Sequence, residues 1–211
     1  MAVRSSGRAD TPLQRQLAGT TARPTALDAF RLARRTFLAG DRVDMQSLAR
    51  ALNVDRATLY RWAGSREQLL SEILWSLIEP TVNGLRAAQT ASQPAATGRQ
   101  SAAAAVITST VRAVIANPGM QRFLDREGEL ALRLLTTKAS GFESRLTALI
   151  RELIDEEIAG GRLQSAVPAE DLPYVLVRIM ESYVYLGLIT GEHPDPDRAA
   201  RVINSLLPPA A

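Results

Sequence analysis

The sequence predicts an all-α protein in which a small N-terminal three-helix unit, containing a helix-turn-helix, precedes a larger helical region. Three observations lead to this fold class. Apolar residues recur three and four positions apart along most of the chain, which is the spacing of a buried helical stripe. Residues that cap or end helices, such as Asp44 and Gly40, bound these stripes. No segment alternates apolar and polar residues over the length of a strand.

The composition excludes several classes of protein. The chain has 211 residues, 46% of them hydrophobic, so it can bury a full core in one or two domains. It has no cysteine, and its one histidine, His193, lies in a Gly-Glu-His-Pro sequence typical of a solvated loop. The common nucleophile–base pairs therefore lack a base, and we expect no enzymatic activity, no cofactor and no metal site. No run approaches the ~18 apolar residues of a membrane-spanning helix and no secretory signal is evident, so we expect a cytoplasmic protein.

Charge is distributed unevenly along the chain. The first 66 residues hold 12 Arg and 5 Asp, a net charge of +7, whereas the remainder holds 13 basic and 17 acidic residues, a net charge of −4. A basic N-terminal third joined to an acidic remainder indicates a polyanionic partner that is met at one end only. Chance clustering of arginines is the alternative.

The first 39 residues divide into a tail and a helix. Residues 1–24 carry four arginines among Ser, Gly, Thr and Pro without sustained periodicity, which predicts a mostly disordered tail. This tail either reaches phosphates or the minor groove beside a DNA-binding unit, or is a solvated leader without function. Thr25 to Ala39 is predicted to be the first helix, and Gly40 to end it. Its expected buried stripe is Ala26, Phe30, Ala33 and Phe37.

Two short helices and the start of a longer one follow in residues 44–70. Asp44 and Asp55 are the residue types that cap helices, and they precede the two short patterns. Asn53 accepts the left-handed conformation that a sharp turn between helices requires. Ser65 and Gln68 have the spacing of a capping box at the start of the third helix. The stripe of the first short helix is Met45, Leu48, Ala49 and Leu52.

The second short helix, 56–62, has one apolar and one polar face. Leu59 and Trp62 can face the core. The opposite face offers guanidinium forks suited to guanine, a phenol, and a methyl group suited to a thymine methyl. These side chains are Arg56, Ala57, Tyr60 and Arg61. On charge alone, an ordinary solvated helix face is an equally valid interpretation.

Met45 to Leu70 resembles the DNA-binding domain of TetR-family transcriptional regulators. The shared pattern is L-A-x-x-L-x-V-x-x-x-T-L-Y followed by S-R-E-Q-L-L, and the resemblance covers roughly residues 25–80. The matching core residues are Leu48, Ala49, Leu52, Val54, Thr58, Leu59 and Tyr60. The sequence departs from the usual pattern in four places: Asn53 replaces a turn Gly, Trp62 a more frequent His or Tyr, Ala63-Gly64 the usual aromatic and its neighbour, and Asp44 a Thr. In its general character the chain is also similar to regulators of quorum-signal degradation.

The resemblance implies a homodimeric, ligand-responsive regulator at the bacterial nucleoid, and we expect a repressor that a small molecule releases from palindromic double-stranded operator DNA. Residues 25–70 would bind DNA, and 71–211 would bind the unidentified effector and dimerise, mainly through 142–159 and 170–190. The expected DNA-binding residues are Gln46, Arg56, Ala57, Thr58, Tyr60, Arg61, Trp62, Ser65 and Arg66. Among them the expected phosphate contacts are Thr58, Tyr60, Ser65 and Arg66, which would fix register without reading sequence.

The second half reads as helices throughout. The helix from Ser65 is expected to stop or kink at Pro80, with a continuation to residue 92 and a loop at 93–98. Two short helices are expected around Gly128. The other predicted helices are 100–116, 142–159, 170–190 and 195–207.

Aromatic and polar side chains on helices that should converge form a candidate ligand site. They are Trp75, Ile78, Thr108, Arg112, Phe123, Phe142 and Tyr183, together with Arg178 in the most apolar stretch. Core packing explains the first seven equally well, and Arg178 can instead pair with Glu181, three residues on. Two alternative functions remain open: a ligand-binding or enzymatic helical bundle without specific DNA binding, and a nonspecific architectural DNA-binding protein.

Overall fold

A computed structural model describes residues 23–92 and 100–210. The predicted loop at 93–98 and all but the last two residues of the predicted N-terminal tail lie outside the described residues. Within these ranges the chain is helical. In chain order the helices are α2 (Ala26–Leu38), α3 (Met45–Ala51), α4 (Arg56–Ala63), α5 (Arg66–Ser92), α6 (Ala102–Ala116), α7 (Pro118–Thr136), the 3-10 helix η1 (Lys138–Ser140), α8 (Phe142–Ala159), α9 (Leu172–Val184), α10 (Leu186–Thr190) and α11 (Pro196–Leu206). The prediction of an all-α fold is confirmed.

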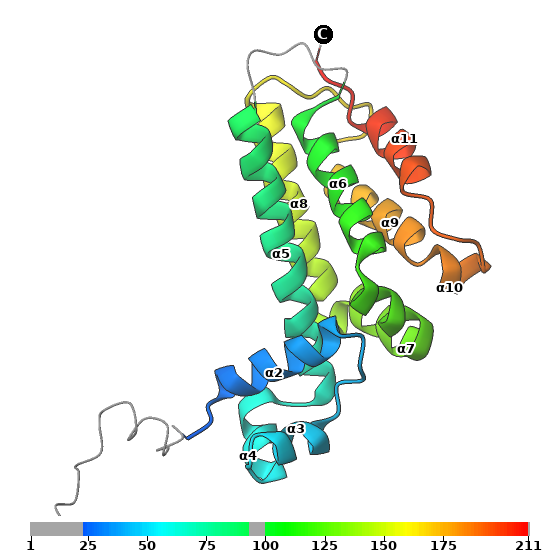
Figure 1. The fold of residues 1–211 in the computed structure, drawn as a ribbon. Coiled ribbons are helices and arrows are strands. Elements are labelled where there is room, and N and C mark those ends of the chain that lie inside the picture. The colour runs from blue at the N-terminus through cyan, green and yellow to red at the C-terminus, as the bar shows by residue number, and fades with distance from the viewer. Residues whose placement is uncertain (1–22, 93–99, 211) are drawn as a thin grey trace, which may run out of the picture.

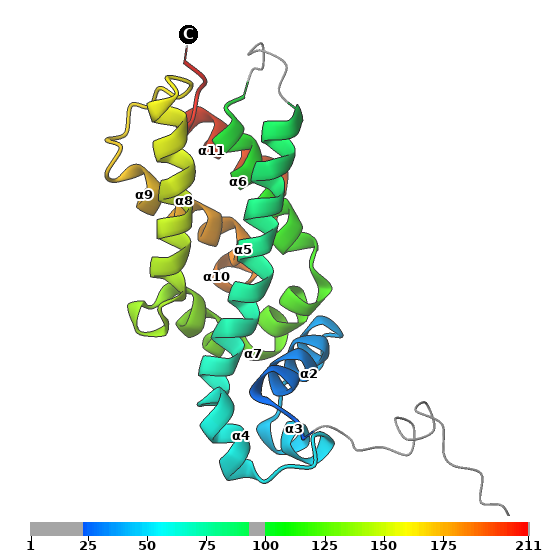
Figure 2. The ribbon, with the colours of Figure 1, turned by 90° about the vertical axis from the view of Figure 1, so that its left-hand side faces the viewer.

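The helices form a small head and a longer bundle (Figure 1). Helices α2, α3 and α4 make up the head, at the lower end of the long helix α5. In the bundle, α5 packs against α6, α8 against α9, and α11 against α6 and α9. Figure 2 shows α5 and α8 running lengthwise, with α7 between the head and the bundle. Since α5 belongs to both parts and α7 contacts α2, two elements connect the head to the bundle.

The core of the head is built on one face of α2. Thr25 and Asp28 form a capping box at its N-terminus, which satisfies backbone N–H groups that lack helical partners. The buried residues of α2 are Ala29, Ala33 and Phe37. The expected stripe was therefore partly wrong, because Ala26 is exposed and Ala29 takes its place, one turn before Ala33.

Helix α5 passes through Pro80 without ending. Proline cannot donate to the carbonyl one turn earlier, but the helix continues to Ser92, so the predicted continuation is confirmed. The Thr81 hydroxyl donates to the Leu77 carbonyl at 2.7 Å, a local side-chain bond within this turn. A single helix consequently runs from the head deep into the bundle.

Helix α7 is one kinked element where two helices around Gly128 were expected. Its non-helical residue is Glu127, with φ −133° and ψ 38°. A Cβ at Gly128 would lie 2.6 Å from Cδ2 of Leu188, so that leucine side chain would have to shift to admit it. The predicted helix at 170–190 likewise divides, at Tyr185, into α9 and α10. No helix in the described ranges is long and apolar enough to cross a membrane.

Candidate nucleic-acid interface and internal cavity

Local capping bonds set the geometry of the helix-turn-helix. The Asp44 carboxylate accepts from the Ser47 N–H at 2.8 Å, and the Asp55 carboxylate from the Thr58 N–H at 2.7 Å. These bonds lower the pKa of both carboxyl groups, so both stay ionised at neutral pH. Asn53, with φ 53°, is the one non-glycine residue with positive φ in the described part of the chain. The caps and the turn residue therefore occupy the predicted positions.

Helix α4 buries one face and exposes the other. Leu59 has no exposed surface, and Trp62 is half-buried against the core. The polar face is exposed, with 41% of Tyr60 accessible. The Arg56 guanidinium carbon lies 5.9 Å from the centre of the Tyr60 ring. The exposed residues of this face are Arg56, Ala57, Tyr60 and Arg61, and Gln46 at the start of α3 is also exposed.

Two expected phosphate-binding residues already have partners within the head. The Thr58 hydroxyl donates to Asp55 at 3.0 Å and accepts from Arg61 at 3.3 Å. The Ser65 hydroxyl accepts from the Gln68 N–H at 3.2 Å, while the Gln68 side chain accepts from the Ser65 N–H. Both hydroxyl groups thus hold the ends of helices.

Arg66 is more buried than the exposed arginines of α4 and has partners outside the helix-turn-helix. Its side chain is 16% exposed and forms an ion pair with Glu127 at 2.7 Å. Its Nε donates to the Val43 carbonyl. The structure therefore gives this guanidinium internal partners instead of the expected phosphate. Sequence reasoning missed this because Glu127 lies 61 positions away in the sequence.

Other side chains of α7 hold the same edge of the head. Arg122 donates to the carbonyl of Ala39, and Arg126 to the carbonyl of Gly40 at 3.1 Å. Arg42 lies 3.8 Å from Glu127. The first half of α7 and its kink thus bind the end of α2 and the loop that follows it.

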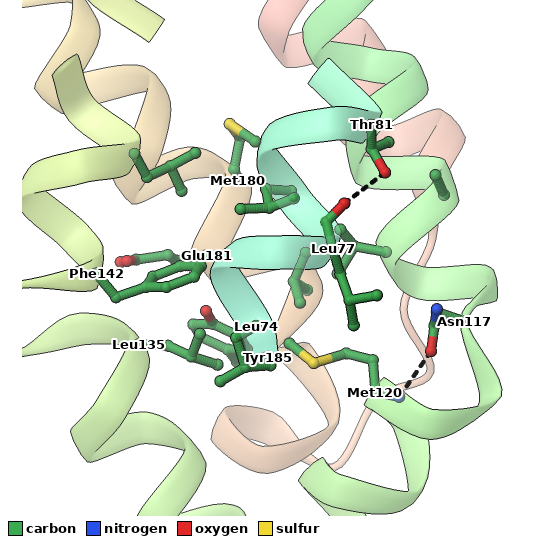
Figure 3. A pocket seen from close by; sticks show the side chains of 15 residues that line it. Leu74, Leu77, Thr81, Asn117, Met120, Leu135, Phe142, Met180, Glu181 and Tyr185 are labelled. Carbon is green, nitrogen blue, oxygen red and sulfur yellow. Dashed lines mark hydrogen bonds between the residues drawn. The ribbon is translucent and has the colours of Figure 1, made fainter. Parts of the chain in front are cut away.

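A partly open cavity of about 90 Å³ lies in the bundle beside α5 (Figure 3). Helices α5, α6, α7, α8 and α9, with the residue that follows α9, contribute to its wall. Most of the wall is apolar. The lining residues are Leu74, Leu77, Ile78, Thr81, Ala113, Val114, Asn117, Met120, Leu135, Phe142, Leu146, Met180, Glu181, Val184 and Tyr185.

Glu181 is the one carboxylate in this wall. It is 8% exposed, and its Oε1 accepts from Arg178 at 3.0 Å. Burial raises the pKa of Glu181 to about 7, and Arg178 opposes that rise without cancelling it. Burial and the nearby Glu181 raise the pKa of Tyr185, so its hydroxyl stays protonated. Figure 3 shows Glu181 and Phe142 among the side chains of the cavity wall.

The structure brings only part of the predicted ligand site together. Ile78 and Phe142 line the cavity, and Trp75 packs edge-on against Phe142 at 6.1 Å. Arg178 pairs with Glu181, which lines the cavity.

Trp75 and Arg178 do not line the cavity themselves, and neither do the other four predicted residues. Thr108 donates to the Ala104 carbonyl, Arg112 pairs with Asp197, and Phe123 packs against Phe37. Tyr183 is half-buried on α9. Sequence reasoning missed Glu181 and Tyr185 as cavity residues, although their four-residue spacing in the most apolar helix was a usable signal.

Comparisons with known proteins agree on one family. Residues 97–208, more than half of the chain, match the family described as "Tetracyclin repressor-like, C-terminal domain". A search of curated proteins gave no match.

Solved structures of repressors share the fold. The transcriptional repressor QsdR of R. erythropolis is 27% identical with a TM-score of 0.68, over 84% of this chain and 91% of that one. AlkX of Dietzia sp. strain DQ12-45-1b is 24% identical with a TM-score of 0.54, over 87% and 92% of the two chains. NalD of Pseudomonas aeruginosa is 14% identical with a TM-score of 0.52, over 86% and 95%. The protein therefore belongs to the TetR family of transcriptional regulators.

Proposed function

We propose that this protein is a ligand-responsive repressor that binds a palindromic operator as a homodimer and leaves it when a small molecule binds. The observation that carries the proposal is the two-sided character of α4. Its inner face is anchored by the fully buried Leu59, and its outer face presents two exposed arginines and a tyrosine. A short helix held in this way suits insertion into the major groove.

The outer face of α4 divides into base-reading and phosphate-binding groups in this proposal. Arg56 and Arg61 are the candidates for guanine edges, and Ala57 for a thymine methyl. Gln46, at the start of α3, reaches a base or the backbone. Tyr60 binds a phosphate. Thr58, Trp62 and Ser65 belong to the same proposed interface, where Thr58 and Ser65 chiefly position the helices and Trp62 is half-buried against the core.

Arg66 has a different role in the proposed mechanism. Because its donors are directed at Val43 and Glu127, it ties the start of α5 to the kink of α7. We assign it to the connection between the head and the bundle.

Effector binding is coupled to DNA binding through α5 and α7. Both helices line the cavity, and both contact the head. A ligand that widens the cavity moves one helix relative to the other and so changes the separation of the two heads in the dimer. Release requires only that the ligand bind the widened form more tightly than the DNA-bound form.

Exposed apolar side chains on the second half support the homodimer. Ile158 on α8 is 40% exposed, Tyr174 on α9 is 54% exposed and Ile189 on α10 is 60% exposed. These residues lie in the two segments expected to form the interface. However, most apolar residues of α8 and α9 are buried within the protomer, so the interface draws on their outer faces.

The resemblance to QsdR favours repression over activation. QsdR is a transcriptional repressor, and the two chains superpose over most of their lengths. Its structure is that of a TetR-family protein, the family to which this chain belongs.

Selection of bound fragments from random double-stranded DNA tests the proposal. We expect an enriched pseudo-palindrome, since two heads related by two-fold symmetry meet two related half-sites. The preference for this site over scrambled DNA should reach ~10³-fold or more. Arg56→Ala should weaken this preference. Arg201→Ala, which removes the same charge at an exposed position of α11, should not. Enrichment of no sequence would overturn the proposal.

A further inference from the structure

One oxygen of the Glu181 carboxylate has no hydrogen-bond partner among the described residues. Arg178 donates to Oε1, and no residue in the described ranges donates to Oε2. The side chain of Glu181 is 10% exposed and lines the cavity. This oxygen is not among the buried, unpartnered side-chain atoms of the described ranges, so it stays accessible, and Glu181 lines the space that a ligand would fill.

The charges around Glu181 do not balance. Arg178 is shared between Glu181 at 3.0 Å and Glu143 at 3.4 Å, so one cation faces two carboxylates. The Nε of Arg178 is buried without a hydrogen-bond partner among the described residues, so the arginine uses only part of its donor set. The pKa of Glu181, raised to about 7 mainly by burial, agrees with incomplete compensation.

The hydroxyl of Tyr185 is a second polar group that could bind a ligand in this cavity. Tyr185 follows Glu181 by four residues, one helical turn, and lines the same cavity. Its hydroxyl makes no hydrogen bond to any described residue of the chain, although the residue is 5% exposed. A ligand group held between Glu181 and Tyr185 would satisfy both.

The rest of the wall limits the size and polarity of the ligand. Met120, Phe142 and Met180 are among its apolar residues, and the cavity measures about 90 Å³. A protein cavity of about 150 Å³ holds benzene. Methionine side chains adapt readily, so displacing Met120 and Met180 can admit a ring or a short branched chain.

We propose that this cavity binds a small apolar amine, whose protonated nitrogen donates to Oε2 of Glu181 and whose hydrocarbon part fills the space between Phe142 and the two methionines. The inference rests on the proposed function, since it names the chemical class of the effector. With both carboxylates ionised, the cluster of Glu143, Glu181 and Arg178 has a net charge of −1. The ammonium group of the ligand neutralises this charge. Above the raised pKa of Glu181, about 7, the ionised carboxylate repels a carboxylate ligand.

Three probes of matched shape test the charge preference: benzylamine, benzyl alcohol and benzoate. Each is titrated into the free protein at pH 8, without DNA, with binding followed by calorimetry. We expect benzylamine to bind about tenfold or more tightly than benzyl alcohol, as a charge-assisted hydrogen bond allows, and benzoate not to bind. Benzoate binding as tightly as benzylamine would overturn the inference, as would no binding of benzylamine.

Two variants separate the carboxylate from its surroundings. Glu181→Gln should reduce the preference for benzylamine over benzyl alcohol to about twofold or less, because the amide lacks the charge. Glu129→Gln removes an exposed carboxylate that does not line the cavity and should leave the preference unchanged. An unchanged preference in Glu181→Gln would contradict the assignment.

The outcome can be distinguished from that for DNA binding. A protein that selects a palindrome but shows no amine preference refutes only the ligand class. A protein that binds benzylamine through Glu181 but selects no DNA refutes only the repressor function. The two assays share no component except the protein.

Discussion

The guanidinium of Arg66, at the start of α5, lies 2.7 Å from the carboxylate of Glu127, at the kink of α7. The two side chains are 16% and 17% exposed, so water screens the pair only partly. The pair joins the two helices that connect the head to the bundle. Its position makes it a direct test of how firmly the head is held.

Glu127→Gln should lower the free energy of unfolding by about 1–3 kcal/mol, because the Arg66 charge stays half-buried without its partner. Urea denaturation followed by circular dichroism measures the change. Glu67→Gln is the matched control, since Glu67 also joins α5 to α7 through Arg133, at 3.7 Å, but both side chains are well exposed. The control should cost less than ~0.5 kcal/mol, and equal costs for the two variants would contradict the role of the Arg66 pair.

Arg66→Ala should destabilise the protein without changing how operator affinity depends on salt. A phosphate contact releases counterions, so its loss makes log affinity less steep in log salt. The Arg66 donors already bond to Val43 and Glu127, and we expect no such change. Operator titrations of folded Arg66→Ala at several salt concentrations measure the slope. A slope reduced by about one unit would restore the phosphate role expected from the sequence.

Arg56→Ala and Arg61→Ala should each cost ~1–3 kcal/mol of operator affinity and relax the preference at one position per half-site. The reason is that a bidentate arginine reads the edge of one guanine.

Tyr60→Phe should weaken binding to operator and to scrambled DNA about equally, because we expect its hydroxyl to contact a phosphate. Titrations on single-substituted operators separate these effects. If Tyr60→Phe relaxed the base preference and the two arginine variants did not, our assignment of the face of α4 that enters the groove would be wrong.

The sequence was sufficient for features that depend on neighbouring residues. Asp44, Asp55 and Ser65 were predicted as caps because each bond spans only three residues. The exposed face of α4 followed from helical periodicity. Both features are properties of a single helix and its ends.

Features that depend on distant residues could not be predicted. The direction of Arg66 is set by Glu127, far along the chain, and the cavity is set by how five helices pack. Thr108, Arg112, Phe123 and Tyr183 were reasonable candidates by residue type, but none lines the cavity. The break in α7 was placed at Gly128 from composition, whereas the non-helical residue is Glu127. Helix propensity alone does not distinguish these two positions.

Tyr174→Glu should weaken dimerisation while leaving the protomer folded, because Tyr174 is 54% exposed on the outer face of α9. Leu27→Glu is a matched control, since Leu27 is 53% exposed but lies on α2 in the head. Sedimentation equilibrium should give a larger dissociation constant for Tyr174→Glu only. Leu176, with no exposed surface, is unsuitable for this test because a charge there would unfold the protomer. A concentration-independent monomer in the unmodified protein would rule out the homodimer.

The stability of the unliganded protein should fall between about pH 4.5 and pH 7 relative to that of Glu181→Gln. The pKa of Glu181 is raised from its ordinary 4.5 to about 7, mainly by burial. Below pH 4.5 the residue is protonated in both the folded and the unfolded chain, so no difference arises. As the pH rises, the unfolded chain releases this proton first, and folding is penalised until the folded pKa is passed.

The raised pKa of Glu181 should lower the free energy of unfolding by about 1–2 kcal/mol over this pH range. This is less than the full pKa shift implies, because water that enters the cavity screens the carboxylate. Urea denaturation of both proteins at pH 5, 6, 7 and 8 measures it, with Glu129→Gln expected to follow the unmodified protein. Saturating benzylamine should reverse the trend, because the ammonium group favours the ionised carboxylate and stabilises the folded state increasingly as Glu181 loses its proton. If the stability difference between the unmodified protein and Glu181→Gln stays constant with pH, Glu181 is already compensated in the folded chain, and the case for a cationic ligand fails with it.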